Sequence, residues 1–175
     1  KIRDQLQQGY PEAVRLRRLA QETAWMAQRG QYNVPRLLQR NDKLTTMLAF
    51  SHFAESAMRA AHLCARSYAP YYKWLLHSTE QLPQGAELAA LLQKSTTLPL
   101  EQWETEIIAP VCAIIAKQMK EQGISTQEES YMQVHAEAAA QQAALLEQKE
   151  ALVEKIVRLE FSEFDKVKNE GVRAG

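Results

Sequence analysis

Apolar residues recur at steps of three and four through nearly the whole chain of 175 residues, and clusters of proline and glycine interrupt them. After Pro11, such steps join Val14, Leu16, Leu19, Ala20, Thr23, Met26 and Ala27. This spacing is that of one face of an α-helix, and a proline in the first helical turn loses no hydrogen bond. The periodicity therefore predicts an all-α fold: a helical bundle of about five to seven helices with a long C-terminal helix.

The first interruptions predict a loop. Gly30 is expected to end the first helix, because glycine adopts the left-handed conformation that closes many helices. Pro35 disfavours helical geometry at the residue before it, so residues 30–35 are predicted to form a loop. Residues 35–40 then form a short helical turn that carries Arg36 and Arg40 on one face. The arginines of the preceding helix, Arg15, Arg17, Arg18 and Arg29, are expected to cover its outer face.

The middle of the chain predicts several more helices. Asn41 or Asp42 is a suitable N-cap for a long helix from Lys43 to about Arg66. The segment Tyr68-Ala-Pro70 interrupts the helical pattern, and residues 71–77 are predicted to form a short helix. A modest helix follows over residues 86–94, and another over residues 100–122 has Pro110 in its middle, where a kink is expected.

The last helix is predicted to start at a capping box. Ser125 with Glu128, or Thr126 with Glu129, has the required spacing. No proline follows, so the remainder is either one helix of more than about forty residues or two helices joined near residues 141–147. Its later part has a wide apolar side, which indicates a partner surface. That side consists of Val153, Ile156, Val157, Phe161, Phe164 and Val167.

Charge and hydropathy exclude several classes of protein. The chain has 21 Lys and Arg against 21 Asp and Glu, so it lacks the strong positive charge typical of nucleic-acid binders. No apolar run approaches the roughly 18 residues that a membrane span needs, and the start lacks the apolar centre of a signal peptide. We therefore predict a cytoplasmic protein without a membrane partner. Because the chain begins without Met and ends at Gly175, we expect it to be a piece of a longer protein.

Catalytic motifs are absent from the sequence. His135-Ala-Glu137 has the spacing of a zinc deaminase motif, but no Cys-x-x-Cys follows, so an ordinary helix histidine is the better interpretation. The chain contains no HExxH, no Gly-x-Ser-x-Gly and no phosphate-binding loop. Cys64 and Cys112 are isolated within helical patterns and are predicted to be reduced structural thiols. We therefore predict no catalytic residue and no metal ligand in this chain.

Two strings carry a resemblance to a known family. They are Gly30-Gln-Tyr-Asn-Val-Pro-Arg36 and Tyr68-Ala-Pro-Tyr-Tyr-Lys-Trp74, the second followed by Leu82-Pro83. Over roughly residues 5–140 the chain resembles the helical C-terminal domain of a bacterial family of unknown function, which is itself similar to nucleotidyltransferases of the kanamycin nucleotidyltransferase type. The resemblance implies that such a helical domain follows a small α/β catalytic domain and lines the substrate side of its cleft.

The resemblance also shows what this chain lacks. A nucleotidyltransferase domain would carry a Gly-Ser motif and paired aspartates that hold Mg²⁺, and neither is present here. The resemblance thus implies Mg²⁺ and a nucleotide in the parent protein, a missing N-terminal catalytic domain as partner, and no cofactor in this chain. The chain alone is not expected to catalyse nucleotidyl transfer.

Substrate recognition is what the chain is expected to contribute. Lys73 or Arg36 would contact a phosphate, with Arg40 one turn beyond Arg36. Tyr72 would supply a stacking surface, and Gln31 and Asn33 polar contacts. Tyr68 and Trp74 are expected to pack the short helix onto the long ones instead. The hypothesis places Lys73, with Arg36 across from it, towards the ligand.

A second resemblance covers the end of the chain. The segment from Leu152 to Ala174 is similar to the opening of another bacterial domain of unknown function, although Val172 stands where that family usually has a second glycine, and nothing follows where a cysteine-containing continuation is expected. We therefore expect a helical bundle over residues 1–145 and the first helix of a second, truncated domain over residues 146–175.

Two functions remain open at this level. The first is the substrate-recognition, structural half of a nucleotidyltransferase-like enzyme. The second is a non-catalytic helical interaction module that forms a homodimer or recruits a partner through its C-terminal helix.

Overall fold

The computed structural model describes residues 9–173, with the side chains of residues 9–155 and of Arg158. Its elements are α2 (Glu12–Trp25), the π-helix η1 (Met26–Asn33), α3 (Val34–Gln39), α4 (Lys43–Cys64), α5 (Tyr72–Glu80), α6 (Gly85–Gln93), the 3-10 turns η2 (Lys94–Thr96) and η3 (Leu100–Gln102), the π-helix η4 (Glu104–Ile108), α7 (Ala109–Glu121) and α8 (Met132–Arg173). Within these residues there is no strand, and six α-helices precede the long α8, so the predicted all-α bundle is confirmed.

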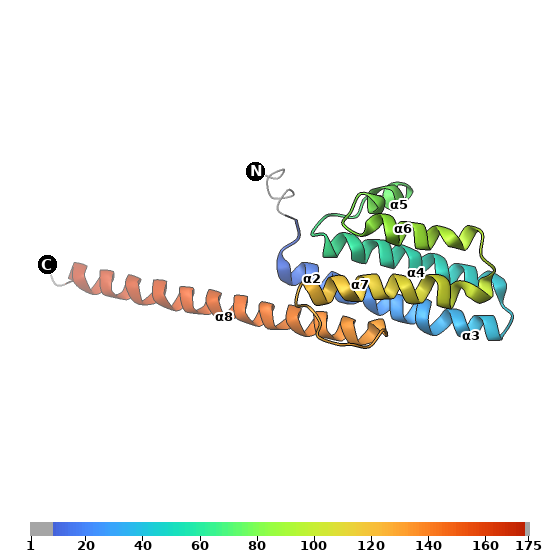
Figure 1. Ribbon diagram of the computed structural model, residues 1–175. Helices are drawn as coiled ribbons and strands as arrows, with labels where there is room; N and C mark the ends of the chain where they lie inside the picture. Colours follow the sequence, from blue (N-terminus) through green and yellow to red (C-terminus); the bar gives the residue numbers. More distant parts are fainter. Residues whose placement is uncertain (1–8, 174–175) are drawn as a thin grey trace.

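The helices form a bundle from which α8 protrudes (Figure 1). Helix α2 contacts both α4 and the first part of α8, and α4 also contacts α7. Helices α5 and α6 lie on the side of α4 away from α8, at the top of Figure 1. The core between these elements is apolar and includes the fully buried Leu19, Phe53, Ile107, Ile115 and Met119.

Gly30 does not end a helix, so the loop predicted over residues 30–35 is wrong. The backbone continues from α2 through η1 into α3, and Gly30 is buried. A Cβ placed on Gly30 would lie 2.3 Å from Cδ2 of Phe53, on α4. The absence of a side chain thus allows close approach of another helix, whereas the sequence interpretation assigned the glycine to a left-handed turn.

Two of the prolines that were expected to disturb a helix follow a π-helical segment. Helix η1 precedes Pro35, and η4 precedes Pro110. In an α-helix a proline lacks one N–H and clashes with the carbonyl four residues earlier, and a wider π turn is a common way to relieve such a conflict. At Pro110 the expected disturbance takes the form of η4.

The predicted capping boxes are not formed, because α8 begins at Met132. Ser125 is buried, and its hydroxyl oxygen lies 2.8 Å from Nδ1 of His135. His135 Nε2 lies 2.9 Å from the carbonyl oxygen of Glu129, so it donates there and Nδ1 accepts from the serine. The segment before α8 is therefore held non-helical by a fully buried histidine. The interpretation of His135 as an ordinary structural residue agrees with this position.

The N-cap of α4, predicted to be Asn41 or Asp42, is Asp42, since its side chain accepts from the backbone N–H of Thr45 at 3.1 Å. The break after α4 and the short helix α5 are also found close to their predicted places.

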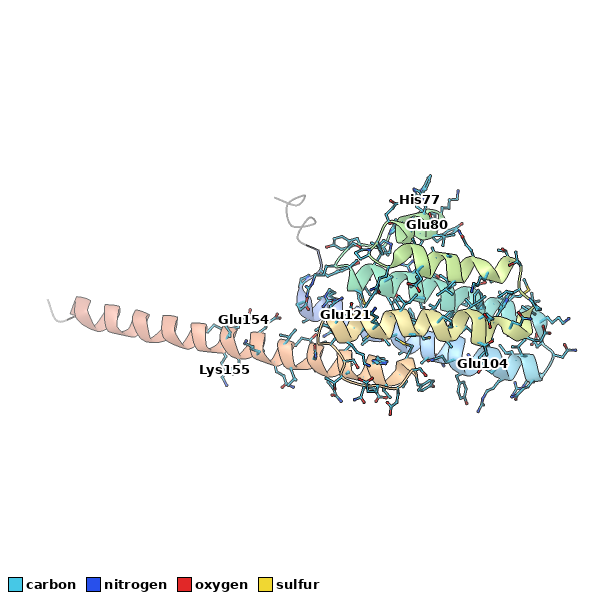
Figure 2. All side chains as sticks on the ribbon, viewed as in Figure 1. His77, Glu80, Glu104, Glu121, Glu154 and Lys155 are labelled. Carbon is cyan, nitrogen blue, oxygen red and sulfur yellow. The ribbon has the colours of Figure 1, made fainter. Side chains whose placement is uncertain are left out.

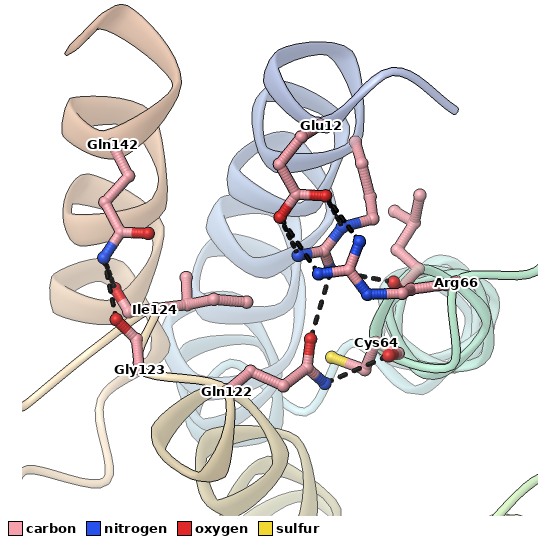
Figure 3. Close-up of polar contacts among 9 residues, drawn as sticks. Glu12, Cys64, Arg66, Gln122, Gly123, Ile124 and Gln142 are labelled. Atoms are coloured by element: carbon pink, nitrogen blue, oxygen red, sulfur yellow. Dashed lines mark hydrogen bonds and ion pairs between the residues drawn. The ribbon is translucent and has the colours of Figure 1, made fainter. Parts of the chain in front are cut away.

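Arg15 was expected on the outer face of its helix, and this is wrong: only 2% of its surface is exposed. Its guanidinium lies beside Glu12, to which Nη2 donates at 2.6 Å, and Figure 3 shows Arg66 on the same carboxylate. Arg15 Nη1 also donates to the carbonyl oxygen of Leu63 at 3.0 Å and to Oε1 of Gln122 at 3.2 Å. A buried charge requires such partners.

This network joins three helices at one end of the bundle. Gln122, just after α7, also donates from Nε2 to the carbonyl oxygen of Cys64, the last residue of α4, at 3.0 Å. The hydrogen bond from Arg15, supported by Arg66, lowers the pKa of Glu12 to about 2. The ends of α2, α4 and α7 are thus fixed together by one guanidinium and its neighbours.

Helix α8 is continuous from Met132 to Arg173, which decides between the one-helix and two-helix alternatives. Its later part extends beyond the bundle (Figure 1). The apolar side predicted from Ile156, Val157, Phe161, Phe164 and Val167 lies outside the described side chains, and Ala174 of the second resemblance lies outside the described residues.

The contact at Gly30 gives a prediction of unusual sign. At an ordinary helix interior, glycine to alanine stabilises a protein by up to about 1 kcal/mol. Because the new Cβ would meet the ring of Phe53, we expect Gly30→Ala to lower the free energy of unfolding by about 1–3 kcal/mol, measured by urea denaturation.

The double variant Gly30→Ala, Phe53→Leu provides the control. Shortening the aromatic side chain should remove most of the steric clash with the alanine. The double variant should therefore be destabilised by less than the sum of the two single variants. A neutral or stabilising Gly30→Ala would contradict the close packing of η1 on α4.

Candidate functional site

Helix α5 exposes most of its first turn. Tyr71, Tyr72 and Trp74 have 65%, 61% and 66% of their surface exposed, and Lys73 between them is exposed too. The rings of Tyr71 and Tyr72 contact each other, with centroids 4.5 Å apart. The expectation that Trp74 packs on the long helices is therefore wrong, because this short helix buries Leu75 and Thr79 and leaves its N-terminal turn outside.

Tyr68 packs, but on a different partner from the one expected. Its ring lies against that of Tyr10, with centroids 4.3 Å apart and the planes at 61°. The guanidinium of Arg18 lies 4.9 Å from the centroid of the same Tyr10 ring. Tyr68 therefore belongs to a half-exposed aromatic contact at the N-terminal edge of the bundle, outside the core.

The other candidates lie on η1 and α3. Asn33, half-buried, is the last residue of η1. Arg36 is exposed, and its guanidinium lies 4.0 Å from the centroid of the Tyr32 ring. Arg40 is exposed at the end of α3. Packing of a guanidinium on an aromatic face restricts its position while keeping its N–H groups available.

Gln31 connects η1 to the start of α8. Its Nε2 donates to the carbonyl oxygen of Ser130 at 2.7 Å, and its Oε1 accepts from the N–H of Met132 at 2.8 Å. The amide therefore bonds the residues on both sides of Tyr131 and caps α8 from outside that helix. Sequence reasoning missed this role because the partners lie about a hundred residues away, at separations of 99 and 101.

The six candidate residues form two separate groups. Figure 1 places α5, with Tyr72 and Lys73, at the top of the bundle, and α3, next to η1, at the bottom right. The structure does not bring Lys73 and Arg36 together, so they do not face each other across one site. Gln31, Asn33, Arg36 and Arg40 form one group, and Tyr72 and Lys73 the other.

A groove of about 430 Å³ lies beside the first group. It is lined by Ala24, Trp25, Gln28, Tyr32, Tyr131 and Gln133, and we call it the η1–α8 groove. Trp25 and Tyr32 are seven residues apart on a helical stretch, a spacing that could have indicated a shared face. Tyr131 comes from the other end of the chain, and nothing in the sequence predicted that it would complete the groove.

Buried titratable groups lie outside both groups. Burial lowers the pKa of His62, whose Nδ1 lies 2.9 Å from Oγ of Ser67. Burial also raises the pKa of Glu22 and brings that of Cys64 to about 12, which makes this thiol unreactive. Cys64 and Cys112 are free and buried, as predicted.

In the part of the chain that the structure describes, there is no group of three or more His, Cys, Asp or Glu residues that could hold a metal ion. On α5, the exposed His77 lies beside the half-buried Glu80 at the top of Figure 2, with Nδ1 and Oε2 3.5 Å apart. The arrangement supports binding chemistry through aromatic rings, amides and guanidiniums.

Comparison with known proteins gives one match. Residues 1–75 match the family described as a domain of unknown function, DUF4037. Both strings that carried the first resemblance, from Gly30 to Arg36 and from Tyr68 to Trp74, lie within the matched residues. No curated protein and no solved structure matches the chain.

Among the described residues, none of the helices combines the length and apolar character that crossing a membrane requires.

The role of Gln31 can be tested by removing both of its hydrogen bonds. We expect Gln31→Leu to lower the free energy of unfolding by about 1–2 kcal/mol, as losing a helix N-cap does. Amide hydrogen exchange should become faster at Met132 and the residues that follow, because the first turn of α8 loses its cap.

The matched control is Gln28→Leu, three residues earlier and exposed on the same π-helix. It should change stability by less than about 0.5 kcal/mol. If both variants behave alike, Gln31 does not anchor α8.

Proposed function

We propose that this helical bundle is the substrate-recognition half of a nucleotidyltransferase-like protein and has no catalytic activity by itself. A catalytic domain preceding it in the parent protein would supply the aspartates, Mg²⁺ and nucleotide. The proposal rests on the resemblance of the two strings described above and on one structural observation, the exposed first turn of α5.

That turn carries three exposed aromatic rings, of which those of Tyr71 and Tyr72 contact each other. Tyr71, Tyr72 and Trp74 are each more than half exposed. Exposed aromatic side chains in a contiguous patch commonly mark binding surfaces. The family-matched part of the chain ends at this helix, since the match covers residues 1–75.

Lys73 gives the surface a charge that suits a phosphorylated substrate. The exposed Lys73 stands between Tyr72 and Trp74 in the sequence, and lysine binds phosphate as a flexible point charge. A base or sugar ring could stack on the neighbouring aromatics while the lysine contacts the phosphate. In this proposal α5 faces the cleft of the catalytic domain.

The test uses the intact parent protein. Titration calorimetry with Mg-nucleotides should show binding, and Lys73→Ala should raise the KM of the substrate by about tenfold, the effect of losing one charged hydrogen bond. Tyr72→Ala should have a similar effect through lost stacking. Lys94→Ala, an exposed lysine on η2, serves as control and should leave the kinetics unchanged.

The proposal fails if the parent protein binds no nucleotide. It also fails if Lys73→Ala combined with Arg36→Ala leaves the activity of the parent protein unchanged.

A second function is favoured by α8, which extends beyond the bundle (Figure 1). Leu145 and Leu152, one heptad apart, are 65% and 57% exposed, and Val153 is 51% exposed. Glu154 and Lys155 mark the same protruding part in Figure 2. Apolar residues at heptad spacing on an exposed helix are typical of helix pairing, so a module that dimerises or recruits a partner through α8 is the alternative.

Light scattering over a range of concentrations tests this alternative. If two copies pair through α8, Leu152→Lys should weaken dimerisation by at least about tenfold, because a charge would be buried in the helix seam. The matched control is Ala151→Lys, at an exposed position next to Leu152, and it should leave dimerisation unchanged. A chain that stays monomeric at all concentrations would exclude the dimer.

A further inference from the structure

We propose that the η1–α8 groove binds a small planar aromatic ring that carries an anionic group, as in a nucleoside monophosphate. The inference concerns a different face of the bundle from α5 and does not depend on the proposed function.

The walls of the groove have the composition of a ring-binding site. Trp25, Tyr32 and Tyr131 provide three aromatic side chains, and Tyr32 and Tyr131 are 45% and 42% exposed. Its volume of about 430 Å³ lies within the range of small-molecule sites. Exposed aromatic rings around a hollow offer stacking surfaces for a planar ligand.

The groove is held in place on both sides. Gln31 bonds Ser130 and Met132, so the backbone is fixed on either side of Tyr131. The buried His135 holds the segment before α8 through Ser125 and Glu129. On the opposite wall, the packing of Gly30 on Phe53 fixes η1 against α4. A site whose walls are fixed before binding loses little entropy when the ligand enters.

Amide groups in the groove can form hydrogen bonds with the edge of a bound ring. Gln28 and Gln133 both line it. The Nε2 of Gln133 donates to Oε1 of Glu137 at 3.1 Å, and this bond orients the amide. Glutamine offers both a donor and an acceptor, which matches the edge of a nucleobase or of a similar heterocycle.

Two guanidiniums stand next to the aromatic walls. Arg29 lies 4.3 Å from the centroid of the Trp25 ring, and Arg36 lies 4.0 Å from that of Tyr32. Among the residues that the structure describes, neither guanidinium forms an ion pair with a carboxylate. The carboxylate of Glu22 lies within electrostatic range of Arg29, so the argument for a ligand with negative charge rests mainly on Arg36 beside Tyr32.

Binding of adenosine 5′-monophosphate to this chain tests the inference. Calorimetry should show saturable binding, and adenosine or inorganic phosphate alone should each bind at least about tenfold more weakly, since each lacks one of the two recognised groups. In the Trp74→Phe background the tryptophans are Trp25 and the buried Trp103, so a fluorescence change on titration reports on the groove.

Variants locate the site. Tyr32→Ala and Arg36→Gln should each weaken binding by about tenfold through lost stacking and lost charge pairing. Lys43→Gln, an exposed cation at the start of α4, should leave the affinity unchanged. Tyr72→Ala, on α5, shows whether the measured binding occurs in the groove or on the α5 surface of the proposed function. Thermal unfolding of each variant shows that a loss of binding is not a loss of folding.

The anionic group of the ligand can be a phosphate or a carboxylate. A parallel titration with indole-3-carboxylate distinguishes the two. Saturable binding that depends on Tyr32 supports the inference for either anion, and the tighter ligand identifies whether phosphate or carboxylate is preferred. Absence of saturable binding by both ligands overturns it, as does binding that Tyr32→Ala and Arg36→Gln leave unchanged. If Tyr72→Ala loses affinity while Tyr32→Ala and Arg36→Gln do not, the ligand binds at α5, which overturns the inference and supports the proposed function.

Discussion

The buried guanidinium of Arg15 is the interaction on which the arrangement of the bundle depends most. A charge with 2% of its residue's surface exposed is tolerated only when it is paired and hydrogen-bonded to acceptors. Those acceptors are Glu12 on α2, the carbonyl oxygen of Leu63 on α4 and the amide of Gln122 after α7. Because three helices must meet for the charge to be satisfied, the network fixes their relative position at one end.

A second set of contacts fixes η1 between α4 and α8. The lack of a side chain at Gly30 brings η1 against Phe53, and Gln31, the next residue, caps α8. Two successive residues therefore place one π-helix against α4 on one side and against α8 on the other. The groove lined by Tyr32 and Tyr131 is a consequence of this double attachment.

The surfaces that packing leaves unused are the reason why we propose a recognition role for this chain. The first turn of α5 exposes rings that the core does not need, and the η1–α8 groove combines rings with amides beside two arginines. They lie on different sides of the bundle, so a ligand at one leaves the other available. The family matched by residues 1–75 is described as one of unknown function, which leaves these surfaces as the basis for experiment.

The sequence by itself determined the helical class, the breaks after α4 and after α5, and an N-cap at Asn41 or Asp42, because each depends on spacing or on a backbone preference within a few residues. It also identified Gln31, Arg36, Tyr72 and Lys73 as residues of interest, but did not place them. The tertiary structure decided that Gly30 serves helix contact, that Arg15 is buried, that Trp74 is exposed and that α8 starts at Met132. Those outcomes depend on partners far away in the chain, such as Phe53 for Gly30 and Gln122 for Arg15. Local periodicity carries no information about which distant side chain will contact a given residue. The groove could therefore be found only in the folded molecule.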